Sequence, residues 1–265
     1  MPTRALRTAA SGMYAQQVNI QVVANNIANL NTNSFKKNRA EFEDLMYQEV
    51  AANPLNSDMP GITEKTAMKV QVGNGVQLSS TQKMFTQGDL QPSGNQLDMA
   101  LQGEGFFQIR KADGTIVYTR DGAFKVSSEG TLVTPSGYVL EPGVKVNGDT
   151  AAVQVSKDGI ISMTETNGET VEAGRLELVK FVNPAGLLAL GNNLFGETQA
   201  SGQPIIGTPG SNGFAEVHQG FSEGSNVDIV EEMVAMITAQ RAYEINSKTV
   251  KTVEDMMELA NNLKR

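Results

Sequence analysis

The chain has 265 residues, a formal net charge of −8, no cysteine and a single histidine, His218. The missing cysteines exclude disulfides and thiolate metal sites, and the acidic balance argues against a nucleic-acid-binding surface, which would be basic. With one histidine, imidazole-based catalysis is nearly excluded, so only carboxylates remain as metal ligands. The sequence contains no run of about 18 apolar residues, which is the pattern that predicts a membrane span. The N-terminus also lacks the pattern of a cleaved secretory signal.

The first predicted element is a long helix over residues 3–31. Its apolar side chains recur at alternating spacings of three and four residues, with Gln16 as the polar exception: Leu6, Ala9, Met13, Ile20, Val23, Ile27 and Leu30. This spacing is typical of one strand of a coiled coil. The other faces carry Asn, Gln and Ala where a solvated helix would carry Lys and Glu. We therefore expect this helix to pack against further protein on several sides, and not only against its own domain.

Residues 35–95 are predicted to connect two domains through an extended β-hairpin. Segment 68–72 alternates as a strand, and Gly73-Asn74-Gly75 predicts a turn from which 76–78 returns antiparallel. Segment 51–61 contains Pro54 and Pro60 and is predicted to form an exposed loop or hairpin tip.

Residues 96–221 are predicted to form an all-β domain. Short alternating runs such as 106–109, 116–118 and 176–179 are separated by Asp-Gly, Glu-Gly, Ser-Gly and Asn-Gly pairs. Turns at this spacing specify a small antiparallel barrel or sandwich. The segment 186–213 is irregular and leads back toward the C-terminal helix.

The last predicted element is a second long helix over residues 224–265. Gly224-Ser225-Asn226 provides a helix start, and Asp228, Glu231 and Glu232 suit the positive end of the helix dipole. At about 1.5 Å per residue the helix would be roughly 55–60 Å long, which is more than one compact domain can cover. Its apolar stripe therefore needs a partner element or a neighbouring molecule.

Together these elements predict an α+β fold. The helices of residues 1–34 and 222–265 would pair as a coiled-coil-like, discontinuous inner domain, with residues 35–95 as connecting hairpin segment and 96–221 as an outer β domain. We assign subunit packing to the helical core positions, namely Leu6, Met13, Ile20, Ile27, Val230, Ile237, Ile245, Met256 and Leu263.

Enzymatic alternatives find little support in the sequence. Gly103-Glu104-Gly105 precedes a strand and lacks the third glycine of a phosphate-binding loop. Asp98, Glu104, Asp113 and Asp121 could be the paired carboxylates of a glycosidase that acts on peptidoglycan. Most of them stand in X-Gly turns, where Asp serves backbone geometry. We expect no catalytic residue, no cofactor and no bound metal, and a structural role for His218.

Five sequence blocks resemble the bacterial flagellar rod and hook protein family. They are Ala-Asn-Asn-Ile-Ala-Asn at 24–29 with Asn-Thr-Asn-Ser-Phe-Lys at 31–36, the run 97–107, Tyr-Thr-Arg-Asp-Gly-Ala-Phe at 118–124, the run 132–138, and 224–228 through 240–248. The signature residues taken from this resemblance are Ala24, Asn25, Asn26, Ala28, Asn29, Phe35, Gln240, Arg241, Ala242 and Tyr243. Ser34 departs from the family, which usually has Gly before the aromatic residue, so the exit from the first helix could be built differently.

The resemblance implies a structural subunit that polymerises into a hollow, torque-transmitting shaft. The chain length and the Thr8–Met13 start favour the distal part of the flagellar rod, with a proximal rod subunit as the alternative. Implied partners are other copies of the chain, proximal rod and hook proteins at the two ends, periplasmic and outer-membrane ring proteins, and the flagellar type III export apparatus. The implied location is the basal body, reached by export without a cleaved signal peptide.

Overall fold

The computed structural model describes residues 2–51, 69–146, 150–165 and 169–263. It divides into two compact units, one formed by residues 1–25, 38–82 and 229–265 and the other by residues 26–37 and 83–228. The hairpin tip predicted at 51–61 lies largely outside the described residues. Among the described residues, no helix is long and apolar enough to cross a membrane.

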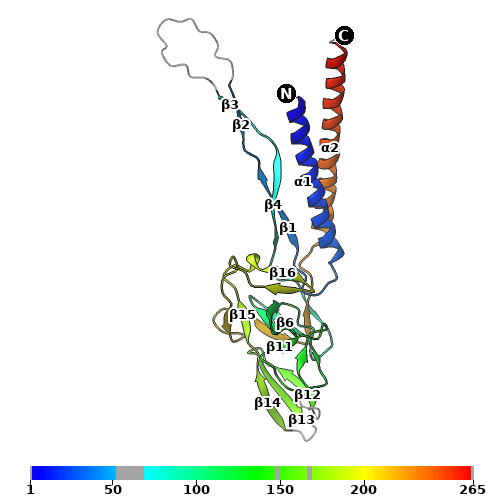
Figure 1. Cartoon of the computed structure of the whole chain (residues 1–265). Coiled ribbons are helices and arrows are strands. Elements are labelled where there is room, and N and C mark those ends of the chain that lie inside the picture. The colour runs from blue at the N-terminus through cyan, green and yellow to red at the C-terminus, as the bar shows by residue number, and fades with distance from the viewer. Residues whose placement is uncertain (1, 52–68, 147–149, 166–168, 264–265) are drawn as a thin grey trace, which may run out of the picture. The chain divides into compact units, whose positions relative to one another are not determined.

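The first unit contains two long helices and a β-ribbon (Figure 1). Helix α1 spans Pro2–Ala28 and helix α2 spans Ile229–Asn262. The ribbon has two arms, β1 (Asn38–Asp44) with β2 (Gln48–Ala51), and β3 (Lys69–Val72) with β4 (Val76–Lys83). Strand β1 pairs with β4, and β2 pairs antiparallel with β3 from Gln48↔Val72 to Ala51↔Lys69.

The prediction of a hairpin turn at residues 73–75 was wrong. Strands β3 and β4 do not pair with each other, because both belong to the same arm of the ribbon. Residues 73–75 form hydrogen bonds with the other arm of the ribbon instead. Leu45 N–H donates to the Gly75 carbonyl (2.9 Å), and the Asn74 side-chain amide donates to the Met46 carbonyl (2.7 Å). Gly75 has φ +111°, and a Cβ there would overlap the Ser11 hydroxyl of α1. Gly75 thus allows both the break in the ribbon and the close approach to the helix.

The second unit is almost entirely β. Its largest sheet runs in the order β16-β17-β8-β7-β11-β10-β9, and β15 joins β7 to β18. The strands of this sheet are β7 (Phe106–Arg110), β8 (Ile116–Thr119), β9 (Lys125–Val126), β10 (Leu132–Val133), β11 (Val139–Glu141), β15 (Leu178–Lys180), β16 (Leu188–Gly191), β17 (Leu194–Gly196) and β18 (Ile205–Gly207). A short 3₁₀ helix, Pro184–Gly186, precedes β16.

Smaller sheets complete the second unit. Strands β12 (Thr150–Val155), β13 (Ile160–Glu165) and β14 (Thr170–Arg175) form an antiparallel meander. Strand β6 (Met99–Gln102) pairs with β19 (Glu216–Gln219), and β5 (Leu90–Pro92) pairs with β20 (Phe221–Glu223). These last two pairs bring the final stretch before α2 back beside the first strands of the β region.

Apolar residues from several of these sheets share one core. The largest cluster includes Met99 and Leu101 of β6, Phe107 of β7, Ile161 of β13 and Leu178 of β15. A second cluster gathers aromatic rings at edge-to-face angles, with Phe106 against Phe181 at 5.8 Å between ring centroids and Tyr118 against Phe181 at 4.8 Å. This shared packing fixes the positions of the loops at the strand ends.

The predicted fold class was wrong about the pairing of the helices and about the form of the β region. The helical ends and the β-rich middle are present, but the two helices do not bury their apolar stripes against each other as a coiled coil requires. In α2 the predicted seam positions are exposed, with Ile237 at 56 %, Ile245 at 62 % and Met256 at 55 %. The buried residues of that helix are Glu232, Ala239 and Val253.

The two helices approach closely at one residue that has no side chain. A Cβ on Gly12 of α1 would lie 2.9 Å from the Asn246 side-chain amide of α2. At this contact a glycine meets a polar side chain and not a large aliphatic one. The β middle is also not one small barrel or sandwich, because a branched sheet and separate two- and three-stranded sheets make it up.

Candidate functional site: a buried charged junction and an exposed helical stripe

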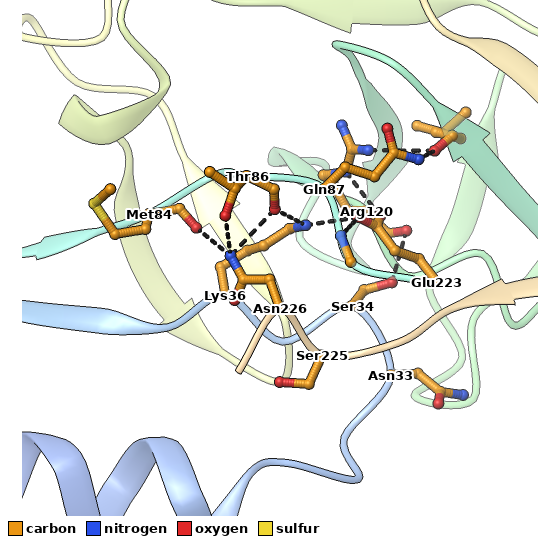
Figure 2. Close-up of polar contacts among 12 residues, drawn as sticks. Asn33, Ser34, Lys36, Met84, Thr86, Gln87, Arg120, Glu223, Ser225 and Asn226 are labelled. Carbon is orange, nitrogen blue, oxygen red and sulfur yellow. Dashed lines mark hydrogen bonds and ion pairs between the residues drawn. The ribbon is translucent and has the colours of Figure 1, made fainter. Parts of the chain in front are cut away.

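Three charged side chains meet in the interior of the second unit, and Glu223, the last residue of β20, lies at their centre. Its carboxylate accepts hydrogen bonds from Lys36 Nζ at 2.6 Å and from Arg120 Nε at 2.9 Å. It also accepts one from the Gly88 backbone N–H at 3.1 Å. Figure 2 shows both cations converging on this carboxylate. The Lys36 and Glu223 side chains are fully buried and that of Arg120 is 3 % exposed.

The remaining donors of the two cations are taken up by backbone carbonyls. Lys36 Nζ donates to the Thr86 carbonyl at 2.8 Å. Arg120 Nη1 donates to the carbonyls of Gly103 and Gly105, each at 2.9 Å, and Nη2 donates to that of Leu101 at 3.3 Å. Burying a charge is costly unless it is paired and hydrogen-bonded, and here both conditions are met. We call Lys36, Arg120 and Glu223 the junction.

The two cations set the ionisation of the junction. Burial by itself raises the pKa of Glu223, but the adjacent Arg120 and Lys36 outweigh burial and hold that pKa below its usual value. Burial lowers the pKa of Lys36, although the Glu223 carboxylate partly opposes this effect. The lowered pKa of Glu223 keeps its carboxylate ionised at neutral pH, beside Arg120 and Lys36.

Ser34 links the junction to the backbone. It has φ +55°, in the left-handed region that glycine adopts most readily. Its hydroxyl donates to the Arg120 carbonyl at 3.0 Å, and its N–H donates to the Glu223 carbonyl at 2.8 Å. The serine thus takes the glycine-like conformation itself, and two hydrogen bonds hold it there.

Asn226 joins the chain segments on either side of the junction. Its side-chain amide donates to the carbonyls of Met84 at 2.8 Å and Thr86 at 3.1 Å (Figure 2). Its Oδ1 accepts the Lys37 N–H at 2.7 Å. The segment that follows α1, the segment that follows β4 and the segment that precedes α2 are therefore tied to one another. The described donors and acceptors of the junction are occupied by the protein itself, which suits a structural connection and not substrate chemistry.

Comparison with known proteins identifies the family. Family models match three parts of the chain: "Flagella basal body rod protein" at residues 6–36, "Flagellar hook protein FlgE/F/G D1 domain" at 100–163 and "Flagellar basal body rod FlgEFG protein C-terminal" at 218–263. The chain is 49 % identical over 269 residues to the flagellar basal-body rod protein FlgG of Borreliella burgdorferi, covering 99 % of each chain. The chain belongs to the flagellar basal-body rod protein family. The FlgG proteins of Agrobacterium fabrum and Bacillus subtilis are 42 % and 36 % identical to it over 98 % and 99 % of this chain, and over 100 % and 99 % of their own lengths.

The predicted resemblance is thereby confirmed, and so is the prediction that this is a structural rod protein and not an enzyme. The carboxylates considered for a glycosidase serve local structure. Asp113 and Asp121 accept the backbone N–H groups of Thr115 (2.9 Å) and Ala123 (3.1 Å). Glu104 pairs with Lys180. Among the described residues, no group of three or more acidic or histidine side chains could hold a metal ion.

The structure places the predicted packing residues of the rod protein in two environments. On α1, Leu6, Met13, Ile20 and Ile27 are half-buried. On α2 all of them are exposed, namely Val230, Ile237, Ile245, Met256 and Leu263. Together with Val234 (58 % exposed) and Leu259 (64 % exposed), the last four of these form what we call the outer stripe of α2.

The family signature residues are divided between burial and exposure. Asn26 and Phe35 are buried, Asn29 and Ala242 are half-buried, and the exposed ones are Ala24, Asn25, Ala28, Gln240, Arg241 and Tyr243. His218 packs edge-on against Phe221 at 6.2 Å between ring centroids. Its Nε2 is a buried nitrogen without a hydrogen-bond partner in the part of the chain that the structure describes.

Sequence reasoning missed the junction entirely. Lys36 and Arg120 both lie within blocks that carry the family resemblance, and Glu223 immediately precedes another. A charged residue inside an otherwise apolar or turn-forming block is a signal that could have been noticed. Nothing in the spacing indicates that residues 103 and 187 positions from Glu223 would meet it.

Proposed function

We propose that this rod protein is a subunit of the distal flagellar rod, where it polymerises into a hollow helical drive shaft that carries torque from the motor to the hook across the periplasm. The chain length, the start at residues 8–13 and the full-length relatives named FlgG support this assignment. A proximal rod subunit of the same family is the alternative. No observation favours a glycosidase.

The observation that carries the proposal is the outer stripe of α2. Its large aliphatic side chains are 55–88 % exposed along almost the whole helix. Arg241 and Thr252 interrupt the stripe, but several large exposed apolar side chains on one side of a helix are typical of a protein–protein interaction site. Burying each of these side chains gains about 1 kcal/mol, since a full transfer of such a side chain from water gains about 1.5–3 kcal/mol. Over the six side chains of the stripe that gain amounts to about 6 kcal/mol, which favours assembly.

The opposite face of α2 is already occupied within the chain. Ala239 and Val253 are buried there. At about 100° per residue both lie about 160° around the helix from Ile237, and they lie about 120° and about 80° from Ile245. The helix therefore has an inner face for its own chain and an outer face for neighbouring copies. Contacts of this non-closing type generate a helical tube.

Within such a tube, residues 1–34 and 222–265 would form the inner helical layer, 35–95 the connecting layer and 96–221 the outer layer. Proximal rod and hook proteins would meet the two ends of the polymer. The basal-body rings would surround it, and the flagellar type III apparatus would export the chain. The acidic surface, with a net charge of −8, would limit adhesion to the rings.

Single charges placed on the outer stripe test the proposal. Ile237→Asp and Ile245→Asp should prevent the purified chain from forming sedimentable polymers and should give cells without complete rods. Lys251→Gln is the matched control, because it changes the net charge by the same unit on an exposed position outside the stripe. Normal polymers from both aspartate variants would refute the role of the stripe.

The position along the rod needs a separate measurement. A tagged chain in purified basal bodies, located by electron microscopy, should lie at the hook-proximal end of the rod. A label at the end nearer the inner membrane would replace the distal assignment with the proximal one.

A further inference from the structure

The chain passes between its two compact units at four points along the sequence. These passages lie between residues 25 and 26, 37 and 38, 82 and 83, and 228 and 229. The second leads into β1, the third directly follows the pairing end of β4, and the fourth leads into α2. The four passages are the covalent connections along which a force on the first unit is carried into the second.

Three of the four passages begin from one set of hydrogen bonds inside the second unit. Lys37, Met84 and Asn226 each lie within two residues of a passage, and all three belong to the second unit. The Asn226 side chain accepts the Lys37 N–H at 2.7 Å and donates to the Met84 carbonyl at 2.8 Å. The Met84 N–H donates in turn to the Lys37 carbonyl at 2.9 Å. Each of the three residues is therefore bonded to the other two, and we call this triangle the clamp.

The remaining passage, in the last turns of α1, is linked to the clamp by the short segment 26–37, which belongs to the second unit. Within this segment the Ser34 N–H donates to the Glu223 carbonyl at 2.8 Å, and the Phe35 carbonyl accepts the Asn226 N–H at 3.3 Å. The backbone that arrives from α1 is therefore held to the same stretch of chain that leads into α2.

The side chain of Asn226 uses both ends of its amide. Its Oδ1 accepts from Lys37, whereas Nδ2 donates to the Met84 carbonyl and to both the carbonyl and the hydroxyl of Thr86 (Figure 2). A carboxylate at this position would lack the donor, and an aliphatic side chain would lack donor and acceptor alike. Asn226 was predicted to belong to the start of the C-terminal helix, but α2 begins further along the chain. The amide therefore serves the clamp.

We propose that Asn226 is a positioning residue whose clamp makes three passages share a force that acts on any one of them. The inference rests on the proposed role as a torque-carrying subunit and identifies where the force enters the β unit. Without the Asn226 side chain, a force on α2 would be carried mainly into β20, a strand of three residues. With it, the same force also acts on Lys37 and Met84, from which β1 and β4 lead away as a paired ribbon.

Hydrogen exchange in the full, unassembled chain tests the clamp itself. Asn226→Ala removes both ends of the amide, so the backbone N–H groups of Lys37 and Met84 should exchange at least about ten-fold faster. Asn226→Asp keeps the acceptor and loses the donor, so it should speed exchange at Met84 and leave Lys37 slow.

Asn95→Ala is the matched control and should change neither group. It removes an asparagine side chain that donates one hydrogen bond and accepts another in an exposed turn of the same unit. Unchanged exchange at Lys37 and Met84 in Asn226→Ala would overturn the inference. Equally faster exchange throughout the β core would overturn it too, because Asn226 would then only support the fold.

The bending stiffness of assembled polymers, measured from their curvature in electron micrographs, tests the sharing of force. Outer β units that are coupled through fewer hydrogen bonds contribute less stiffness, so polymers of Asn226→Ala should be softer than those of the unsubstituted chain. Asn226→Asp polymers should lie between them, and they keep the test available where Asn226→Ala does not assemble.

Equal stiffness of the Asn226→Asp and unsubstituted polymers would overturn the sharing of force and leave the proposed polymer intact. Failure of the unsubstituted chain to polymerise would overturn the proposed function, while the exchange measurement would still decide whether the clamp exists.

Discussion

Replacing Glu223 by glutamine removes the negative charge of the junction and keeps its shape. In the native protein each carboxylate oxygen accepts a hydrogen bond from a cation, Oε1 from Lys36 and Oε2 from Arg120. A glutamine offers one oxygen and one NH₂ group, so one of the two cations would face a donor. Removing one partner of a buried ion pair costs about 3–5 kcal/mol, because the remaining charge stays buried without compensation.

We therefore expect Glu223→Gln to lower the free energy of unfolding of the β-rich unit by about 3–5 kcal/mol, which is a large share of the roughly 5–15 kcal/mol of a whole domain. The assay is chemical denaturation of the full chain, followed by the near-ultraviolet circular dichroism of its tyrosines. Glu172→Gln, at an exposed position of β14, is the control and should change stability by less than about 0.5 kcal/mol. A loss below about 1 kcal/mol for Glu223→Gln would show that the junction does not hold the unit together.

The other predictions concern the same region. The pKa of Glu223 is lowered in the folded chain, so the stability that this residue contributes is complete above pH 4.5 and is lost as the pH falls through the lowered pKa. Below that pH the wild type and Glu223→Gln should therefore have similar free energies of unfolding. Curves of stability against pH that stay parallel for the two proteins would contradict this. Ser34→Ala should destabilise the chain by about 1–2 kcal/mol more than Ser34→Gly in urea unfolding, since both lose the hydroxyl but only glycine relieves the positive φ; equal losses would argue against backbone strain. A Cβ at Gly122 would overlap the carbonyl oxygen of Met99, so Gly122→Ala should lower the melting temperature by an amount equivalent to about 3 kcal/mol, whereas Gly143→Ala, which has open space, should not.

The helices were predictable because periodicity extends over many turns, but the face that each one buries was not. Helix α2 buries Glu232, Ala239 and Val253 and leaves its isoleucine and leucine side chains exposed, whereas sequence reasoning chose the large aliphatic residues for the intramolecular contact. The chain uses Ala239 and Val253 there and leaves Ile237 and Ile245 exposed. The size of an apolar residue does not reveal whether its partner lies in the same molecule, since both kinds of contact remove it from water.

The β region shows a similar division between local and distant information. Turns at Gly114, Gly130 and Gly137 follow from local sequence, and all three have positive φ. Strand pairing depends on segments far along the chain, which is why 73–75 was misassigned as a hairpin. The junction is the extreme case, because Lys36, Arg120 and Glu223 are neighbours only after the whole β unit has closed.

The junction also orders events along the chain. Its two cations are encoded at positions 36 and 120, but their counter-charge is encoded at 223, after almost all of the β unit. A chain cut short before that residue has two cations with no anion between them, so closing the interior around them is unfavourable. Contacts of such long sequence separation also make folding slow. The completed β unit is therefore available only to a chain that is nearly full length, and such a chain contains the segment that leads into α2.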